Sequence, residues 1–327
     1  MALAVRLQAQ GGPDMCKLEE VEVPSPGPGE VALRHTAIGL NFIDVYQRDG
    51  RYKVSLPSGL GQEAAGVVTA VGPGVEGFKP GDRVAYAGGP LGAYAEARTY
   101  PAAKLVPIPE GVSDEVAAAS LLKGLTTWYL TRRTFRVERG QTVVVHAAAG
   151  GVGLLLCQWL RYLGATVIGT VGTEAKADLA RQSGCTHPYV LTEQTRAGFV
   201  PRVKELTSGA KVPVVYDSVG RETFELSLES LAPLGLLVLF GASSGPVPPF
   251  DLQRLAPAGS LYVTRPTLVT YTAKREDLLQ GAKELFDLIA QGHLTVHVNQ
   301  RYPLREVARA HRDLEARKTT GSTVLLP

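Results

Sequence analysis

Residues 146–153 read His-Ala-Ala-Ala-Gly-Gly-Val-Gly, and they join the apolar run 142–145 to the amphipathic run 154–163. A strand, a glycine-rich turn and a helix in this order are typical of a dinucleotide-binding unit. Gly150 and Gly153 let the backbone approach a pyrophosphate, and the free N–H groups at the helix start attract its charge. Because Ala148 replaces the first glycine of the full motif, the turn also fits tight strand–helix packing without a ligand.

The residues after the second strand, expected at 165–171, favour NADPH over NADH. An NAD site carries Asp or Glu about 20 residues after the glycines, but this chain continues Gly172-Thr173-Glu174-Ala175-Lys176. The hydroxyl of Thr173 and the ammonium of Lys176 suit a 2′-phosphate on the ribose. In the alternative interpretation Lys176 is a solvated helix residue, and Glu174 disfavours the phosphate.

Composition indicates a folded, two-domain chain. It has 327 residues, of which 45% are hydrophobic and 20% are charged, and this excludes extensive disorder. The net charge of +3 is scattered, without a basic stripe interleaved with aromatic residues. A nucleic-acid partner is therefore not expected.

The segment that opens the chain predicts a first strand rather than a signal peptide, and no run is long enough to span a bilayer. Cys16, Cys157 and Cys185 are far apart in the sequence, so neither a disulfide framework nor a CxxC site is expected. A cytoplasmic location follows as the expectation.

The pattern of apolar runs and turns in the sequence changes near residue 124. Before it, short strand-like runs alternate with Gly-Pro turns, which indicates a mostly β domain. After it, apolar strands alternate with helices, which predicts an α/β fold with a doubly wound parallel sheet. We expect strands at 30–37, 64–71, 83–86, 143–146, 167–171, 212–217, 236–241, 259–264 and 322–326, a helix at 276–291, and a strand, turn and helix across 302–314.

Five runs together resemble the quinone oxidoreductase, or zeta-crystallin, branch of the medium-chain dehydrogenase/reductase superfamily. They are Ile38 to Asp44, Gly61 to Gly66, Ala147 to Gly153, Val215 to Gly220 and Phe240 to Gly245. The resemblance implies a GroES-like catalytic domain over 1–124 and again over 260–327. It also implies a Rossmann NADPH-binding domain over 125–259.

Zinc is not expected in this chain. Where the alcohol dehydrogenases of the superfamily carry a catalytic Cys and the His of a Gly-His-Glu motif, this sequence has Asn41 and Gln62. Amide side chains bind zinc poorly. An acceptor that takes hydride readily, such as a quinone, is therefore favoured, with orientation of donor and acceptor as the main catalytic device.

Four polar residues near the matched runs are candidates to contact the acceptor. Asn41 can donate an amide N–H to a substrate or cofactor oxygen, and Tyr46 and Tyr52 can line the nicotinamide site. For each tyrosine, packing is an equally good explanation. Asp44 is better explained as a helix cap or an ion-pair partner.

The remaining cofactor contacts are those that the resemblance implies. Arg317 is a candidate second cation for the phosphate, and a surface position explains it nearly as well. The full set is Asn41, Phe42, Tyr46, Thr127, Tyr129, Gly150, Gly151, Val152, Gly153, Gly172, Thr173, Lys176, Val219, Phe240, Gly241, Ala242, Ser243, Pro266, Thr267, Leu268 and Arg317.

Three functions stay open at this stage. The first is NADPH-dependent quinone reduction, and the second is reduction of an enal, enone or enoyl double bond with the same cofactor. The third is a non-catalytic protein that binds NADPH or RNA, as the lens crystallins of the family suggest. The apolar strands at 236–240 and 261–264 predict a homodimer through a sheet edge.

Overall fold

The computed structural model describes residues 1–327, which form two compact units. The first comprises Met1–Leu125 with Thr272–Pro327, and the second is the continuous segment Thr126–Tyr271. The chain therefore returns to the first unit at Thr272 rather than at residue 260, because residues 262–264 pair within the sheet of the second unit.

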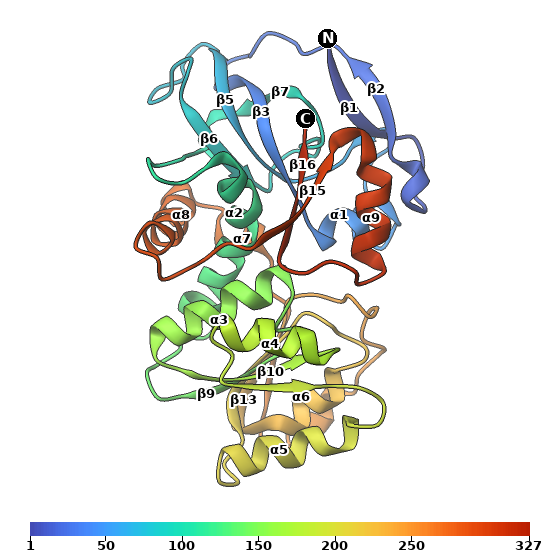
Figure 1. Ribbon diagram of the computed structural model, residues 1–327, viewed down its shortest axis with the longest axis vertical. Helices are drawn as coiled ribbons and strands as arrows, with labels where there is room; N and C mark the ends of the chain where they lie inside the picture. The colour runs from blue at the N-terminus through green and yellow to red at the C-terminus, as the bar shows by residue number, and fades with distance from the viewer. The chain divides into compact units, whose positions relative to one another are not determined.

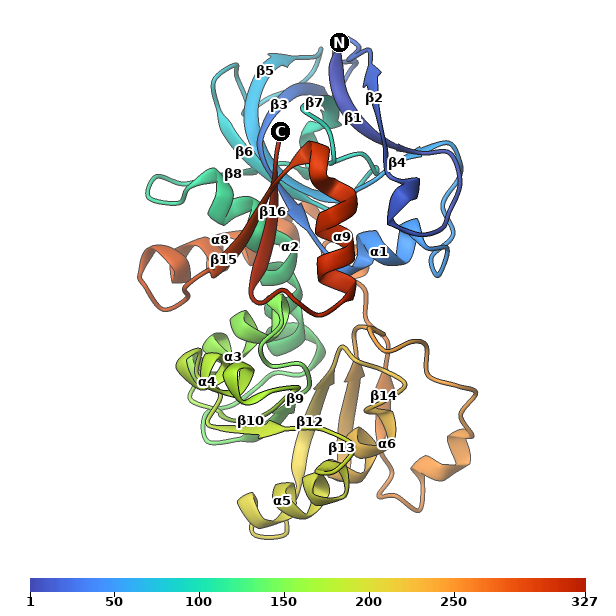
Figure 2. The same cartoon turned by 45° about the vertical axis from the view of Figure 1, so that its right-hand side comes forward.

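The second unit is built on one parallel sheet of six strands in the order β11-β10-β9-β12-β13-β14 (Figures 1 and 2). This is the doubly wound order of a Rossmann fold, with β9 first along the chain and central in the sheet. The strands are β9 (Thr142–Val145), β10 (Thr166–Val171), β11 (His187–Val190), β12 (Val212–Asp217), β13 (Leu231–Leu239) and β14 (Tyr262–Thr264).

Helices cross over between these strands, as parallel pairing requires. They are α3 (Gly151–Leu163), α4 (Glu174–Gln182), α5 (Phe199–Leu206) and α6 (Phe224–Ser230), and the short helix α7 (Leu268–Tyr271) follows β14. Branched side chains of the central strands pack with Phe199 and Phe224, which come from α5 and α6. The apolar runs are continuous rather than alternating because both faces of the sheet are covered.

The first unit is rich in β-structure. Its larger sheet has the order β15-β16-β3-β5-β6-β8 with β7 also paired to β3, and its smaller sheet has the order β2-β1-β4. The strands are β1 (Ala2–Leu7), β2 (Lys17–Val21), β3 (Glu30–Leu40), β4 (Ser58–Gly59), β5 (Glu63–Val71), β6 (Arg83–Ala87), β7 (Ala97–Pro101), β8 (Val106–Pro107), β15 (Val298–Pro303) and β16 (Ser322–Leu326).

The helices of this unit are α1 (Phe42–Arg48), α2 (Asp114–Tyr129), α8 (Arg275–Ala290) and α9 (Val307–Glu315), with the last turn of α2 belonging to the second unit. The C-terminal segment completes the first unit because β16 pairs antiparallel with β3, with Leu325 opposite Ile38. Figure 1 shows α9 beside this pair, near α1. None of the helices combines the length and the apolar character needed to cross a membrane.

Most of the predicted strands have somewhat different limits in the structure; the strand expected at 30–37, for example, extends to Leu40. The strand expected at 236–241 begins at Leu231 and ends at Leu239. The strand expected at 259–264 begins only at Tyr262, because Gly259 and Ser260 have φ of 115° and 55°, which extended backbone does not tolerate. The predicted strands at 212–217 and 322–326 are confirmed at both ends.

Candidate functional site

The glycine-rich turn begins with a left-handed residue. Ala147 has φ of 55°, and its carbonyl accepts the N–H of Gly150 at 2.9 Å. A Cβ added to Gly153 would lie 2.2 Å from the same carbonyl oxygen, so only glycine fits there. Helix α3 then starts at Gly151 with no side chain capping it, which leaves its first backbone N–H groups for a ligand.

The turn also packs closely against the neighbouring strand. A Cβ on Gly169 of β10 would lie 2.7 Å from the Cβ of Ala148 and 2.5 Å from Sγ of Cys185. Gly153 and Gly169 thus allow the turn to sit directly on the neighbouring strand. The same glycines serve the fold and keep the start of α3 open.

The end of β10 brings Thr173 and Lys176 together at the start of α4. Thr173 is the N-cap residue, and its Oγ1 accepts the backbone N–H of Lys176 at 3.3 Å. Gly172, Thr173 and Glu174 are exposed. The capping bond uses the oxygen of Thr173 as an acceptor, so its hydroxyl hydrogen is still able to donate to a phosphate.

A buried carboxylate organises the turn after β12. Asp217 is fully buried and accepts the N–H groups of Val219 and Gly220 at 2.8 and 3.0 Å. The hydroxyls of Thr223 and Ser227 also donate to it. Asp217 was not among the predicted site residues, although it is an acidic residue at the end of an apolar strand.

The turns after β12 and β13 lie against each other at the carboxyl end of the sheet. The N–H of Ser243 donates to the carbonyl of Ser218 at 3.1 Å, and Ser244 Oγ donates to the carbonyl of Val219 at 2.7 Å. The predicted contacts Val219, Phe240, Gly241, Ala242 and Ser243 are therefore neighbours. Ligands of doubly wound folds bind at this end of the strands.

One aromatic pair joins the two ends of the second unit. Tyr129 stacks on Tyr271 with ring centroids 4.5 Å apart and planes 8° apart. Tyr129 is almost completely buried, and this desolvation raises the pKa of its hydroxyl well above the usual value. Thr267 Oγ1 bonds Thr270 Oγ1 at 2.9 Å at the start of α7, and Thr127 is fully buried in α2.

In the first unit, Asn41 begins helix α1 as its N-cap residue. Asn41 and Asp44 form a capping box, in which the Asp44 carboxylate accepts the backbone N–H of Asn41 at 2.9 Å. Tyr94 also donates to this carboxylate, at 2.8 Å. The interpretation of Asp44 as a cap is confirmed.

The predicted tyrosines share an aromatic cluster on α1 and the loop after it. The ring of Tyr46 lies 5.4 Å from that of Tyr52 and 6.2 Å from that of Phe42. Tyr46 is buried, whereas Tyr52 is 40% exposed. The guanidinium of Arg51 lies 4.3 Å from the Tyr46 ring centroid, which makes this face of the cluster electropositive.

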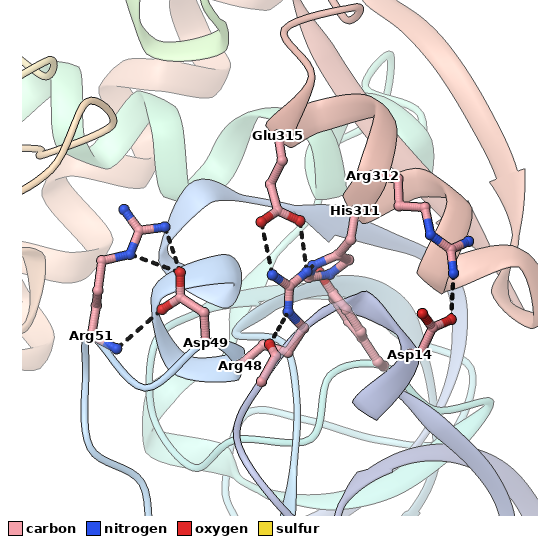
Figure 3. Close-up of polar contacts among 9 residues, drawn as sticks. Asp14, Arg48, Asp49, Arg51, His311, Arg312 and Glu315 are labelled. Atoms are coloured by element: carbon pink, nitrogen blue, oxygen red, sulfur yellow. Dashed lines mark hydrogen bonds and ion pairs between the residues drawn. The ribbon is translucent and has the colours of Figure 1, made fainter.

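A buried polar network joins α1 to α9 (Figure 3). Arg48 is 1% exposed and forms a two-bond ion pair with Glu315, each bond 2.8 Å long. It also lies 3.0 Å from Nδ1 of His311, whose Nε2 lies 3.2 Å from the Tyr94 hydroxyl. Arg48 can only donate, so Nδ1 of His311 accepts and Nε2 carries the proton.

Sequence reasoning missed this network because its members are 217 to 267 positions apart. Arg317, two residues after the network's Glu315, has φ of 59° and follows the end of α9. It belongs to the first unit, whereas Thr173 and Lys176 belong to the second. Its predicted contact with a phosphate stays a prediction.

Comparisons with known proteins identify the fold and the family. Residues 27–110 match the alcohol dehydrogenase GroES-like domain, and residues 151–285 match the zinc-binding dehydrogenase domain. The chain is 53% identical to a quinone oxidoreductase of Pseudomonas aeruginosa, with both chains fully covered. It is 48% identical to quinone oxidoreductase 1 of Escherichia coli, again over the full length of both.

The chain belongs to the quinone oxidoreductase family. Its structure superposes on that of the Escherichia coli quinone oxidoreductase, described as complexed with NADPH, with a TM-score of 0.96 over the full length of both chains at 48% identity. It is also 46% identical to a 2-haloacrylate reductase of a Burkholderia species, over 100% of this chain and 99% of that protein. The predicted fold class and family are confirmed.

The name of one family domain refers to zinc, but the residues of this chain do not fit it. Asn41 Nδ2 donates to Glu63 Oε2 at 2.8 Å, so its nitrogen is not a ligand atom, and Gln62 is a second amide. No group of three or more His, Cys, Asp or Glu side chains is arranged to hold a metal ion. A catalytic zinc needs three such ligands.

Proposed function

We propose that this protein is a zinc-independent oxidoreductase that transfers reducing equivalents from NADPH to a quinone. The observation that carries the proposal is full-length similarity to quinone oxidoreductases, one of them described with NADPH bound. The open glycine turn at the start of α3 supports it, because such a turn suits a pyrophosphate. NADPH supplies the hydride when bound.

We assign cofactor binding to the carboxyl ends of β9, β10, β12 and β13. The N–H groups at Gly151 and Val152 would hold the pyrophosphate, and Thr173 and Lys176 would hold the 2′-phosphate. The turns at Val219 and at Phe240–Ser243 would line the path toward the nicotinamide. The other residues predicted to contact the cofactor, including Arg317, keep that assignment as part of this proposal.

On the acceptor side, the tilted rings of Phe42, Tyr46 and Tyr52 offer aromatic surface for a quinone ring. Asn41 at its edge supplies a polar group for a quinone oxygen. Reduction forms an aromatic hydroquinone, so orientation of the two reactants is sufficient for much of the rate. Water or a tyrosine hydroxyl would supply the proton.

We further propose a cytoplasmic homodimer. All three cysteines are free and buried, which suits a reducing compartment. Strand β14 is the edge of its sheet, and Tyr262 and Val263 on it are 59% and 38% exposed. An exposed apolar edge strand is an ordinary place for a second copy to pair.

One relative supports a second candidate function. The similarity to a 2-haloacrylate reductase suggests reduction of a conjugated carbon–carbon double bond with the same cofactor. That reaction requires the site to orient one carbonyl and to protonate the neighbouring carbon, which a quinone does not demand.

The test is oxidation of NADPH and NADH by purified protein with benzoquinones, naphthoquinones, enals and 2-haloacrylates, with and without a chelator. We expect NADPH-dependent turnover of quinones that is insensitive to the chelator. Turnover only with the alkenes would establish the second candidate. NADPH binding without turnover of any acceptor would contradict both.

A further inference from the structure

Asn41 is held at both ends by buried carboxylates. Its backbone N–H donates to Asp44 Oδ2 at 2.9 Å, and its side-chain Nδ2 donates to Glu63 Oε2 at 2.8 Å. Both carboxylates have no exposed surface. The capping box also turns the Asn41 side chain toward the backbone N–H of Asp44. Because a carboxylate only accepts, Nδ2 must be the atom that faces Glu63.

Glu63 cannot move to accommodate a different amide. Its Oε1 accepts the backbone N–H of Leu122 at 2.6 Å, and Nζ of Lys123 lies 3.5 Å from its Oε2. A Cβ at Gly39 would lie 2.3 Å from Oε2, so the carboxylate lies directly on the backbone of β3. Each oxygen of Glu63 therefore has an assigned donor.

We propose that Glu63 is a positioning residue that fixes the Asn41 amide as a hydrogen-bond donor toward an oxygen of the acceptor. One Nδ2 hydrogen bonds Glu63, the amide oxygen faces the start of α1, and the second Nδ2 hydrogen is left for a ligand. The identity of the acceptor rests on the proposed function. The orientation of the amide does not.

Isosteric substitutions test this orientation. In Glu63→Gln, the backbone N–H of Leu122 needs an acceptor, so the oxygen of the new side-chain amide takes the position of Oε1. The NH₂ group of the new amide then takes the position of Oε2 and faces the NH₂ group of Asn41. Asn41 must then rotate, and its donor is lost. Adding Asn41→Asp restores a hydrogen bond between residues 63 and 41 but leaves no donor for an acceptor oxygen.

We expect E63Q to lower kcat for quinone reduction about 10-fold or more, the size of effect that follows loss of one oriented donor. The KM for NADPH should rise by a smaller factor than kcat falls, because Asn41 is only one of the residues predicted to contact the cofactor. In the double variant E63Q/N41D, the melting temperature should rise above that of E63Q, short of the wild-type value because the Glu63–Lys123 ion pair is lost, while kcat stays low. Recovery of kcat together with the melting temperature would overturn the proposal, since any complementary pair would then suffice.

Glu96→Gln is the matched control. Glu96 also accepts a backbone N–H, that of Leu3, at 2.8 Å in the same unit. Its substitution should leave kcat unchanged. An equal loss of kcat in E96Q would assign the effect of E63Q to general destabilisation and overturn the inference.

The amide can also be observed without turnover. Asn41 and Asn299 are the two asparagines of this chain, so ¹⁵N-asparagine labelling yields two side-chain NH₂ signals. Asn299 donates to Thr320 at an exposed position and serves as the reference. In the wild-type protein with NADP⁺, one Asn41 hydrogen should be shifted downfield by the carboxylate, and the other should shift when a quinone is added.

These signals separate the two proposals and remain informative if E63Q does not fold. A wild-type Asn41 pair with neither hydrogen shifted downfield would overturn the positioning role, whatever the activity. A shifted pair that does not respond to a saturating quinone would overturn the donor role. A shifted pair that responds to an enal, in a protein that does not reduce quinones, would leave the positioning role standing and reject the quinone assignment.

Discussion

At the scale of single residues, the first unit contains ionisable groups whose burial changes their protonation. Burial raises the pKa of Asp44 to about 7, against the lowering effect of the Tyr94 and Asn41 hydrogen bonds; neighbouring Glu63 raises it further and Lys123 lowers it. Burial lowers the pKa of His311 to about 3. Asp44 and His311 therefore make the free energy of unfolding change with pH in opposite directions.

We predict that Asp44→Asn reduces the loss of unfolding free energy that occurs as pH rises. The folded pKa of Asp44 is raised from 3.8 to about 7, so its contribution to stability is fully present below pH 3.8 and is lost as pH rises through 7. The expected loss is a few kcal/mol, at most about 4, since each pKa unit corresponds to about 1.4 kcal/mol.

Urea unfolding of the wild type and D44N between pH 4.5 and 8 measures this difference. Comparison of the two proteins removes the histidine contributions, which act in the opposite direction. Asn retains an oxygen for the Asn41 and Tyr94 donors. Parallel stability curves for the two proteins would show that Asp44 does not titrate in this range.

A second residue prediction concerns Lys176. Its ammonium is proposed to bind the 2′-phosphate beside Thr173, and a charge-assisted bond to phosphate contributes about 1.5 to 3 kcal/mol. Lys176→Ala should therefore raise the KM for NADPH about 10-fold or more, with the KM for NADH unchanged. Steady-state kinetics with both cofactors checks this, and an equal rise for both would assign Lys176 to the fold instead.

At the scale of secondary structure, the turn from β9 to α3 depends on close approach of two backbones. Gly153→Ala would place a Cβ 2.2 Å from the Ala147 carbonyl oxygen, whereas Gly150→Ala would place one at 3.3 Å. We expect G153A to cost about 1 to 3 kcal/mol of unfolding free energy and to weaken NADPH binding, and G150A to cost much less. Chemical unfolding and fluorescence titration measure both effects, and equal losses would contradict this account.

Arg48 of α1 attaches to helix α9 through Glu315 and His311. Arg48 is buried and pairs with Glu315, whose side chain is 33% exposed. Arg48→Met should lower the unfolding free energy by about 2 to 4 kcal/mol, since it also removes the donor to His311. Hydrogen exchange should rise in α9 before it rises in β16, and unchanged exchange in α9 would show that apolar packing alone holds the helix.

At the scale of the whole molecule, the prediction concerns the edge of the parallel sheet. Val263 on β14 and Val71 at the end of β5 are each 38% exposed, so they form a matched pair. Val263→Lys should convert a dimer into a monomer, because a lysine on an edge strand opposes pairing, while Val71→Lys should not. Light scattering gives the mass of each, and a wild-type monomer would reject the proposed dimer.

The sequence by itself determined the parallel sheet, the family and the glycine turn, because these depend on local periodicity and on a close backbone approach at Gly153 that only glycine allows. It also predicted, through the family resemblance, that Asn41 and Gln62 stand where related enzymes carry zinc ligands. The tertiary structure alone decided the partners of Asn41 and Arg48. Glu63 and His311 reach them from 22 and 263 positions away, and such pairings arise from how strands and helices pack, which no local pattern records.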